Sequence, residues 1–231
     1  MKFQKKFFLG AAFITFFTYI FFFMKQHDPL EIRYIPIGDS YTIGEGARSE
    51  EAWPNLLVKD LRADGVPSTL VANPARTGWT SEDALLREMS IFGAAKPTFA
   101  TLLIGVNDFV QGVSVDQFRA NFEQLIDQMI EVLPSKQRLL IATIPDFSVT
   151  PAGKGFGDPK KLSAGVAEFN TIIKTVAMGR GLEVVDIFAL SQAMGTDSSL
   201  VAVDGLHPSA REYALWEQLI KPAARNLLLG R

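Results

Sequence analysis

The chain has 231 residues, 48% of them hydrophobic, which is enough for one globular domain of about 200 residues and a small additional segment. It has no cysteine, which excludes disulfides, thiolate nucleophiles and zinc–thiolate sites, and its two histidines, His27 and His207, are too few for a polyhistidine metal site. Residues 1–25 hold four of the 23 basic residues and no acidic one. The rest of the chain, with 19 basic against 25 acidic residues, is a poor candidate for nucleic-acid binding.

The first predicted element is an uncharged apolar run at residues 7–24. As a helix it would span about 27 Å, close to the apolar thickness of a bilayer. No small-residue cleavage site follows it, so we expect an uncleaved membrane anchor, with a cleaved signal peptide as the alternative. Three lysines precede the run and only Lys25 directly follows it, which predicts that the remainder is exported. We therefore assign residues 1–30 to an anchor with a short linker, in which His27 is a polar boundary residue, and residues 31–231 to one domain.

A buried strand is predicted at Tyr34–Ile37, and the Gly-Asp-Ser sequence after it ends in Ser40. Ligands bind at the carboxyl ends of the strands in open α/β sheets, so Ser40 lies where chemistry is usually done. The alternative is an ordinary turn that caps the next helix. The glycine-rich stretch Thr42–Gly46 does not fit a phosphate loop, because no lysine follows the glycines and Glu45 would repel a phosphate.

Strands and helices alternate along the rest of the chain. We predict further strands at about 68–72, 99–104, 138–143 and 182–186, and helices at about 51–63, 116–132, 163–178 and 209–228, with one more helix that begins at a cap formed by Thr80 or Ser81. This alternation predicts a five-stranded parallel sheet with right-handed crossovers, in a three-layer α/β/α sandwich. The Gly- and Pro-rich segment Pro145–Lys161 is expected to be a long irregular loop that forms a wall or lid over a site.

Four more polar or glycine residues follow predicted strands. Gly78 lies after the second strand, Asn107 after the third, and Asp204 and His207 between the fifth strand and the last helix. A carboxylate three residues from an imidazole can fix the ring tautomer and stabilise the imidazolium formed when the other nitrogen takes a proton from a serine. The alternative is a glycine turn in which His207 is incidental. Ser40 and all four of these residues lie on loops at the carboxyl side of the predicted strands. We therefore favour one shared site.

These residues resemble the conserved blocks of the SGNH hydrolases, also known as the GDSL esterase/lipase family. The matching blocks occur in the family's order within residues 32–226 and are Gly38-Asp39-Ser40-Tyr41, Gly78, Gly105-Val106-Asn107-Asp108 and Asp204-Gly205-Leu206-His207-Pro208. The family name has Leu after the serine where this chain has Tyr41, a departure that does not touch the reacting atoms.

The resemblance implies a flavodoxin-like sheet and a serine esterase without a metal or cofactor. It makes Ser40 the nucleophile, His207 the base and Asp204 its orienting partner, with the Ser40 N–H, the Gly78 N–H and the Asn107 side chain as the oxyanion hole. The chemistry agrees, because a serine hydroxyl needs a base and a tetrahedral oxyanion needs donors. The α/β-hydrolase elbow is a poorer fit, since no Gly-x-Ser-x-Gly surrounds Ser40.

We therefore expect an outward-facing, membrane-anchored esterase that acts through an acyl-enzyme. Lysophospholipids, other short or medium acyl esters and acetylated envelope sugars all fit as substrates, and the oligomeric state is left open. Alternatives are an acyltransferase on the same fold and a non-catalytic binding module, which is disfavoured because it would be expected to have lost one of the five groups. The aromatic residues Trp79, Phe109 and Phe147 are candidates to line an acyl pocket, although packing is the commoner role.

Overall fold

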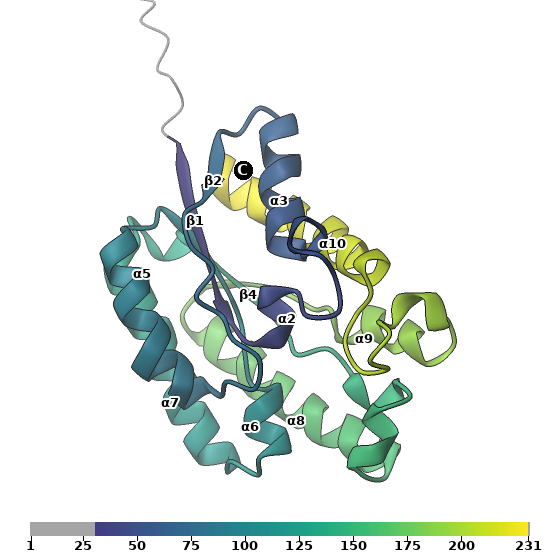
Figure 1. Ribbon diagram of the computed structural model, residues 1–231. Coiled ribbons are helices and arrows are strands. Elements are labelled where there is room, and N and C mark those ends of the chain that lie inside the picture. Colours follow the sequence, from purple (N-terminus) through teal and green to yellow (C-terminus); the bar gives the residue numbers. More distant parts are fainter. Residues whose placement is uncertain (1–30, 231) are drawn as a thin grey trace, which may run out of the picture. The chain divides into compact units, whose positions relative to one another are not determined.

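The computed structural model describes residues 31–230, in which five parallel strands are covered by helices on both faces (Figure 1). The sheet order is β2-β1-β3-β4-β5, and the strands are β1 (Ile32–Gly38), β2 (Ser68–Leu70), β3 (Phe99–Leu103), β4 (Leu139–Ala142) and β5 (Glu183–Val185). The predicted three-layer fold is confirmed. The apolar run predicted to be an anchor lies outside the described residues, and no helix within residues 31–230 is long and apolar enough to cross a membrane.

The three central strands are apolar on both faces because helices cover both faces of the sheet. Every residue of β3 and β4 is buried, and in β1 only Arg33 is exposed. Pro36 lies within β1 although it has no N–H to donate. The pairing of β1 with β2 ends at Tyr34, two residues before Pro36. The missing N–H of Pro36 therefore costs no hydrogen bond to β2.

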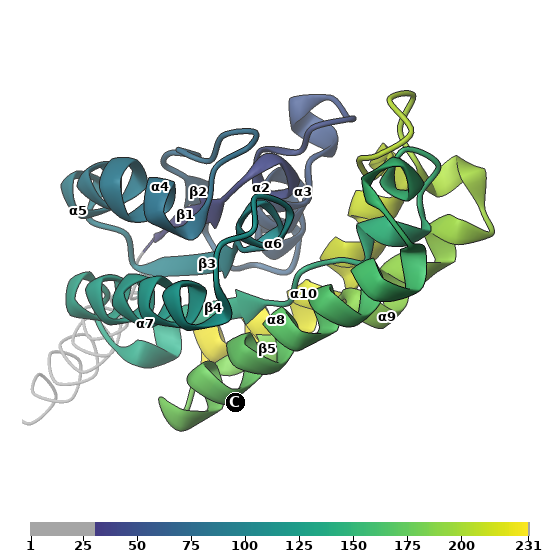
Figure 2. The same ribbon diagram turned by 90° about the horizontal axis from the view of Figure 1, so that it is seen from below.

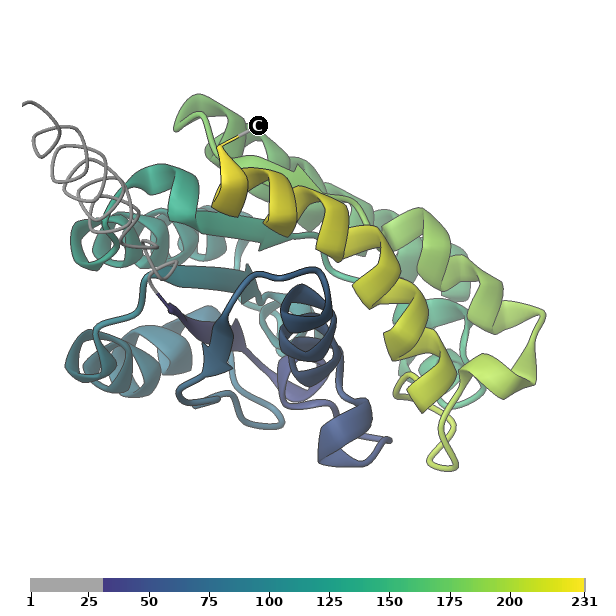
Figure 3. The ribbon, with the colours of Figure 1, turned by 90° about the horizontal axis from the view of Figure 1, so that it is seen from above.

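The helices form two layers. α3 (Trp53–Ala63) and α10 (Ala210–Leu229) pack together on one face (Figure 3), and α5 (Met89–Ala95), α7 (Val115–Val132) and α8 (Pro159–Gly179) cover the other (Figure 2). Each long helix buries one stripe of side chains, and each fully buried large apolar side chain contributes about 1.5–3 kcal/mol. In α7 the buried apolar stripe is Phe118, Phe122, Leu125, Ile126 and Met129.

The segment predicted as a long irregular loop is shorter and more ordered than expected. α8 begins at Pro159, because Asp158 caps it by accepting the Lys161 N–H at 3.0 Å and proline suits the first helical turn. Two 3₁₀ turns, η4 (Phe147–Val149) and η5 (Gly153–Phe156), occupy most of the remainder. The expectation of a structureless loop as far as residue 161 was therefore wrong.

The buried carboxylate of Asp146 holds this segment in place through hydrogen bonds to neighbouring segments. Asp146 accepts hydrogen bonds from Ser148 Oγ at 2.6 Å, Ser163 Oγ at 2.6 Å and Gln192 Nε2 at 3.2 Å, and its N–H donates to Ser191 Oγ at 2.7 Å. The segment is held to α8 and to the chain after β5. It therefore forms a fixed part of the sheet's carboxyl side.

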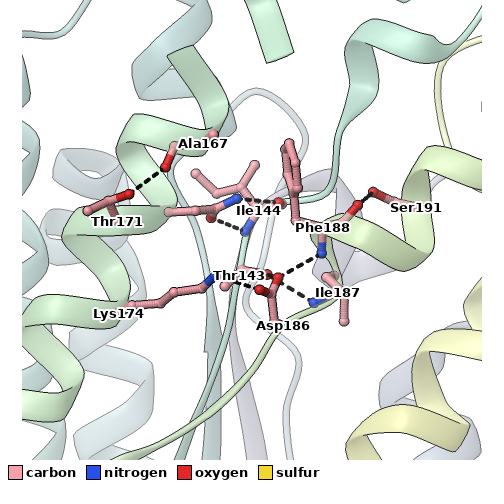
Figure 4. Close-up of polar contacts among 10 residues, drawn as sticks. Thr143, Ile144, Ala167, Thr171, Lys174, Asp186, Ile187, Phe188 and Ser191 are labelled. Carbon is pink, nitrogen blue, oxygen red and sulfur yellow. Dashed lines mark hydrogen bonds and ion pairs between the residues drawn. The ribbon is translucent and has the colours of Figure 1, made fainter. Parts of the chain in front are cut away.

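A second carboxylate fixes the chain where it leaves β5. Asp186 accepts from Thr143 Oγ1 at 2.9 Å and from the Phe188 N–H at 3.1 Å, and it pairs with Lys174 Nζ at 2.5 Å (Figure 4). These contacts join β4, α8 and α9 (Phe188–Ser191). The stretch after α9 was predicted to be irregular, and it contains the 3₁₀ turns η6 (Gln192–Gly195) and η7 (Ser198–Leu200).

Candidate active site

Ser40 is the first residue of α2 (Ser40–Ile43), a one-turn helix directly after β1. Asp39 caps this helix by accepting the Tyr41 N–H at 3.0 Å, and Ser40 itself is 5% exposed. Glycine is required at position 38, because a Cβ there would lie 2.2 Å from the Leu103 carbonyl oxygen. The glycine-rich stretch predicted at Thr42–Gly46 is therefore part helix, and the loop begins only at Gly44, whose φ is +86°.

Asp204 and His207 face each other across a turn. Asp204 Oδ2 lies 2.6 Å from His207 Nδ1, while Oδ1 accepts the N–H of Leu206 at 2.8 Å and that of His207 at 2.9 Å. Burial raises the pKa of the Asp204 carboxyl, but these hydrogen bonds outweigh it and hold the net pKa below the ordinary value. An ionised carboxylate is thus fixed against one ring nitrogen, which leaves Nε2 for another partner.

Two side-chain hydrogen bonds connect the segment around Asn107 to the loop that carries Gly78. Asn107 lies in α6 (Val106–Val110), and its Nδ2 donates to the Trp79 carbonyl at 2.9 Å and lies 3.5 Å from Asp39 Oδ2. Gln111 Nε2 donates to the Gly78 carbonyl at 3.1 Å. Gly78 has a φ of +82° and no atom within 4 Å of the place a Cβ would take, so its backbone is open to an approaching group.

The residues before and after Ser40 each contact one of these two parts of the site. On one side, Asp39 approaches Asn107, and on the other the Tyr41 ring packs edge-on against the His207 ring, with centroids 5.9 Å apart. Within residues 31–230 no hydrogen bond joins Ser40 Oγ to His207. The hydrogen bond between a nucleophile and its base is often long before a substrate binds and shortens only in the complex.

Two fully buried acids lie under the Ser40 turn. Glu88 comes from η2 (Ala84–Glu88), a π-helical turn between α4 (Ser81–Asp83) and α5, and it accepts the Gly38 N–H at 3.2 Å. Burial raises the pKa of Glu88 to about 8 and that of Asp39 also to about 8, where the charge of Asp108 adds to the effect of burial. Burial therefore disfavours the charged form of both acids under the Ser40 turn.

The raised pKa of Glu88 predicts a pH dependence of stability. Between its ordinary value of 4.5 and about 8, the folded protein keeps a proton that the unfolded chain releases, so stability falls as pH rises. Glu88→Gln should reduce this slope by up to about 1.4 kcal/mol per pH unit, while Asp39 retains its own contribution. Urea unfolding at pH 5, 6.5 and 8 measures the slope. An unchanged slope in the variant would show that Glu88 is already ionised in the fold.

Asn107→Ala separates a catalytic from a structural role. As an oxyanion donor, Asn107 would act mainly in the transition state, so kcat should fall about 10²- to 10³-fold with KM nearly unchanged. A purely structural Asn107 would cost only the hydrogen bond to Trp79, about 1 kcal/mol of stability. Gln111→Ala is the matched control, because it removes the other bond to this loop, and it should lower kcat less than 10-fold. Early melting with normal turnover in Asn107→Ala would remove Asn107 from the site.

Three contacts at the site were not predicted from the sequence. The Glu45 carboxylate lies beside Asp204 and His207, the Gln111 amide donates to the Gly78 carbonyl, and the carbonyl of Trp79, predicted only as an aromatic candidate, accepts from Asn107. Of the aromatic candidates, Phe109 and Phe147 belong to a cluster with Phe156 and Phe169, and Trp79 lies under the Arg87 guanidinium, 5.7 Å from the ring centroid. These contacts arise between distant segments and leave no local sequence signal.

The parallel α/β/α fold, with its serine and its Asp–His pair at the carboxyl side of the sheet, defines the class of ester-hydrolysing serine hydrolases. Residues 37–215 match the model of the GDSL-like Lipase/Acylhydrolase family, and the chain belongs to this family.

The chain is also similar to curated proteins named as esterases, and its fold is similar to that of a solved structure. The chain is 26% identical over 209 residues to the rat (Rattus norvegicus) isoamyl acetate-hydrolyzing esterase 1 homolog, a match that covers 82% of each protein. It is 30% identical over 121 residues to a multidomain esterase of Ruminococcus flavefaciens, covering 51% of this chain and only 14% of that protein. The crystal structure of TesA superimposes with a TM-score of 0.70 at 21% identity, over 84% of this chain and 99% of TesA.

Proposed function

We propose that this protein hydrolyses carboxylic esters through an acyl-enzyme formed on Ser40. The observation that carries the proposal is the 2.6 Å contact between Asp204 Oδ2 and His207 Nδ1, on a turn whose histidine packs against the residue next to Ser40. A carboxylate at Nδ1 keeps the proton on that nitrogen, so Nε2 is free to accept the Ser40 hydroxyl proton.

The proposed reaction has two balanced steps. Ser40 Oγ attacks the ester carbonyl as His207 takes its proton, and the resulting tetrahedral intermediate expels the alcohol, which leaves with that proton. A water molecule then attacks the acyl-enzyme, again losing its proton to His207, and the carboxylic acid is released as Ser40 recovers its hydrogen.

We further propose that the oxyanion of each tetrahedral intermediate is bound by the Ser40 N–H, the Gly78 N–H and Asn107 Nδ2. The Ser40 N–H lies at the amino end of α2, where backbone N–H groups point outward. The Asn107 amide has two hydrogens. The bond to the Trp79 carbonyl at 2.9 Å orients the group, and the contact with Asp39 Oδ2 is 3.5 Å long, so we propose that an oxyanion replaces it. Donors held in place before the reaction act more strongly than water because they need no reorganisation.

The substrate class is the less defined part of the proposal. Short acyl esters are the first to test, because the rat relative is named for an acetate ester. Lysophospholipids and acetylated envelope sugars remain candidates for the natural substrate. The test is a panel of p-nitrophenyl esters of increasing acyl length, run with the purified full-length protein and with Ser40→Ala. Hydrolysis that depends on Ser40 supports the esterase, whereas binding without turnover of any ester would indicate a binding module. Acyl transfer to an added alcohol that outpaces hydrolysis would indicate an acyltransferase.

We also propose that residues 1–30 anchor the domain to a membrane, with the domain on the outer side. The apolar run at residues 7–24 and the lysines before it support this. The full-length protein should then stay in the membrane fraction after a high-salt wash, whereas a variant that begins near Asp28 should appear in the soluble fraction and keep its activity. Recovery of a mature chain that starts between residues 20 and 30 would contradict the anchor and indicate a cleaved signal peptide.

A further inference from the structure

Glu45 lies beside the Asp204–His207 pair although it is far away in the sequence. One carboxylate oxygen of Glu45, one of Asp204 and a ring nitrogen of His207 all lie within 4.8 Å of one another. Glu45 is half-buried and Asp204 is exposed, so solvent and an incoming substrate can reach this part of the site.

The position of Glu45 is fixed by contacts with three parts of the site. Its N–H donates to the Ser40 carbonyl at 2.9 Å, its carbonyl accepts from Tyr213 Oη at 2.8 Å, and its carboxylate accepts from Thr77 Oγ1, next to Gly78. The following residue, Gly46, packs so tightly on the His207 turn that a Cβ would lie 2.9 Å from the Pro208 carbonyl oxygen. The carboxylate is therefore held close to His207 by its surroundings.

Among the residues that the structure describes, the Glu45 carboxylate forms no ion pair with a lysine or arginine. Across residues 31–230, Asp204 forms none either, and its single ionic contact is His207. While His207 is neutral, two carboxylates that form no ion pair with a lysine or arginine of the described residues thus lie beside its ring, Asp204 at Nδ1 and Glu45 within 4.8 Å of a ring nitrogen. A substrate whose alcohol carries a negative charge must bring that charge close to both of them.

We propose that Glu45 determines specificity for the leaving alcohol, selecting esters of neutral or cationic alcohols and rejecting alcohols that carry a carboxylate or phosphate. The inference rests on the proposed esterase function and names the substrate class of the same site. Unit charges about 6 Å apart near a protein surface interact strongly enough to change a rate constant by about 10-fold or more. The effect is electrostatic, so it weakens as salt screens the charges.

The test compares three acetate esters that differ in the charge of the leaving group. They are 4-nitrophenyl acetate, the acetate of 5-hydroxy-2-nitrobenzoic acid and the acetate of 3-hydroxy-N,N,N-trimethylanilinium. Glu45→Gln keeps an acceptor for Thr77 and removes the charge, Glu45→Asp keeps the charge, and Glu131→Gln removes an exposed carboxylate of α7 as the matched control. The ratio of kcat/KM for the anionic to the neutral ester should rise about 10-fold in Glu45→Gln, and the ratio for the cationic ester should fall.

Both ratios should stay near the wild-type values in Glu45→Asp and Glu131→Gln, and the effect of Glu45→Gln should shrink between about 0.01 and 0.5 M salt. Equal ratios in the wild type and Glu45→Gln, with hydrolysis still dependent on Ser40, would overturn the role of Glu45 alone. If the wild type hydrolyses none of the three esters in a Ser40-dependent way, the proposed esterase function fails and the inference fails with it.

Discussion

Ser40→Ala is expected to lower kcat by about 10⁶-fold, because no acyl-enzyme can form without the hydroxyl. The fold should survive. The cap of α2 is the Asp39 carboxylate, which accepts the Tyr41 N–H, so the Ser40 side chain is not needed to begin the helix.

The measurement is single-turnover kinetics with Ser40→Ala and wild type purified in parallel, together with thermal melting of both. The melting temperatures should agree within a few degrees. A correctly folded Ser40→Ala protein that retains more than about a hundredth of the wild-type rate would show that another group is the nucleophile.

Asp204→Asn is expected to lower kcat by about 10⁴-fold near neutral pH, because the His207 ring would take the wrong tautomer. The backbone hydrogen bonds to Asp204 Oδ1 determine how the new amide would be oriented in Asp204→Asn. Asp204 Oδ1 accepts the N–H of Leu206 and of His207, so the amide oxygen must stay there and the NH₂ group must replace Oδ2. That NH₂ would donate to His207 Nδ1, which places the ring proton on Nε2 and leaves no acceptor for the Ser40 proton.

Asp197→Asn is the matched control for this substitution. Asp197 also accepts a backbone N–H two residues ahead, from Ser199 at 3.0 Å, but it caps the 3₁₀ turn η7. Its replacement should leave kcat within a few-fold of wild type. Comparable losses in the two variants, or a nearly normal rate in Asp204→Asn, would show that Asp204 does not set the tautomer of His207.

The sequence predicts those parts of this fold that depend on the pattern of neighbouring residues. Five apolar runs alternating with amphipathic helices were sufficient for the parallel sheet, because buried parallel strands need little besides continuous apolar character. The contact between Asp204 and His207 was also predictable, since three residues on one turn separate them. The early start of α8 was missed although Asp158 and Pro159 are an ordinary cap and first-turn residue.

Contacts between distant segments were not predictable. The approach of Asn107 to Asp39 joins residues 68 positions apart, and the bond between Thr77 and Glu45 joins residues 32 apart. The π-helical turn η2, whose Glu88 accepts the Gly38 N–H, packs against α7 and β1, which are distant in the sequence. The sequence therefore indicated which residues are candidates for the site, and the structure adds the contacts and charges around them.

The most direct test of the account is covalent labelling of the full-length protein with a fluorophosphonate, followed by mass spectrometry of the digested chain. The phosphonyl group should be found on the peptide that contains Ser40, with its site of attachment at that residue. Labelling should be lost in Ser40→Ala and slowed in Asp204→Asn, because the base that activates the hydroxyl would be misoriented. Attachment to a different serine, or labelling that persists in Ser40→Ala, would contradict the assignment of Ser40 as the nucleophile.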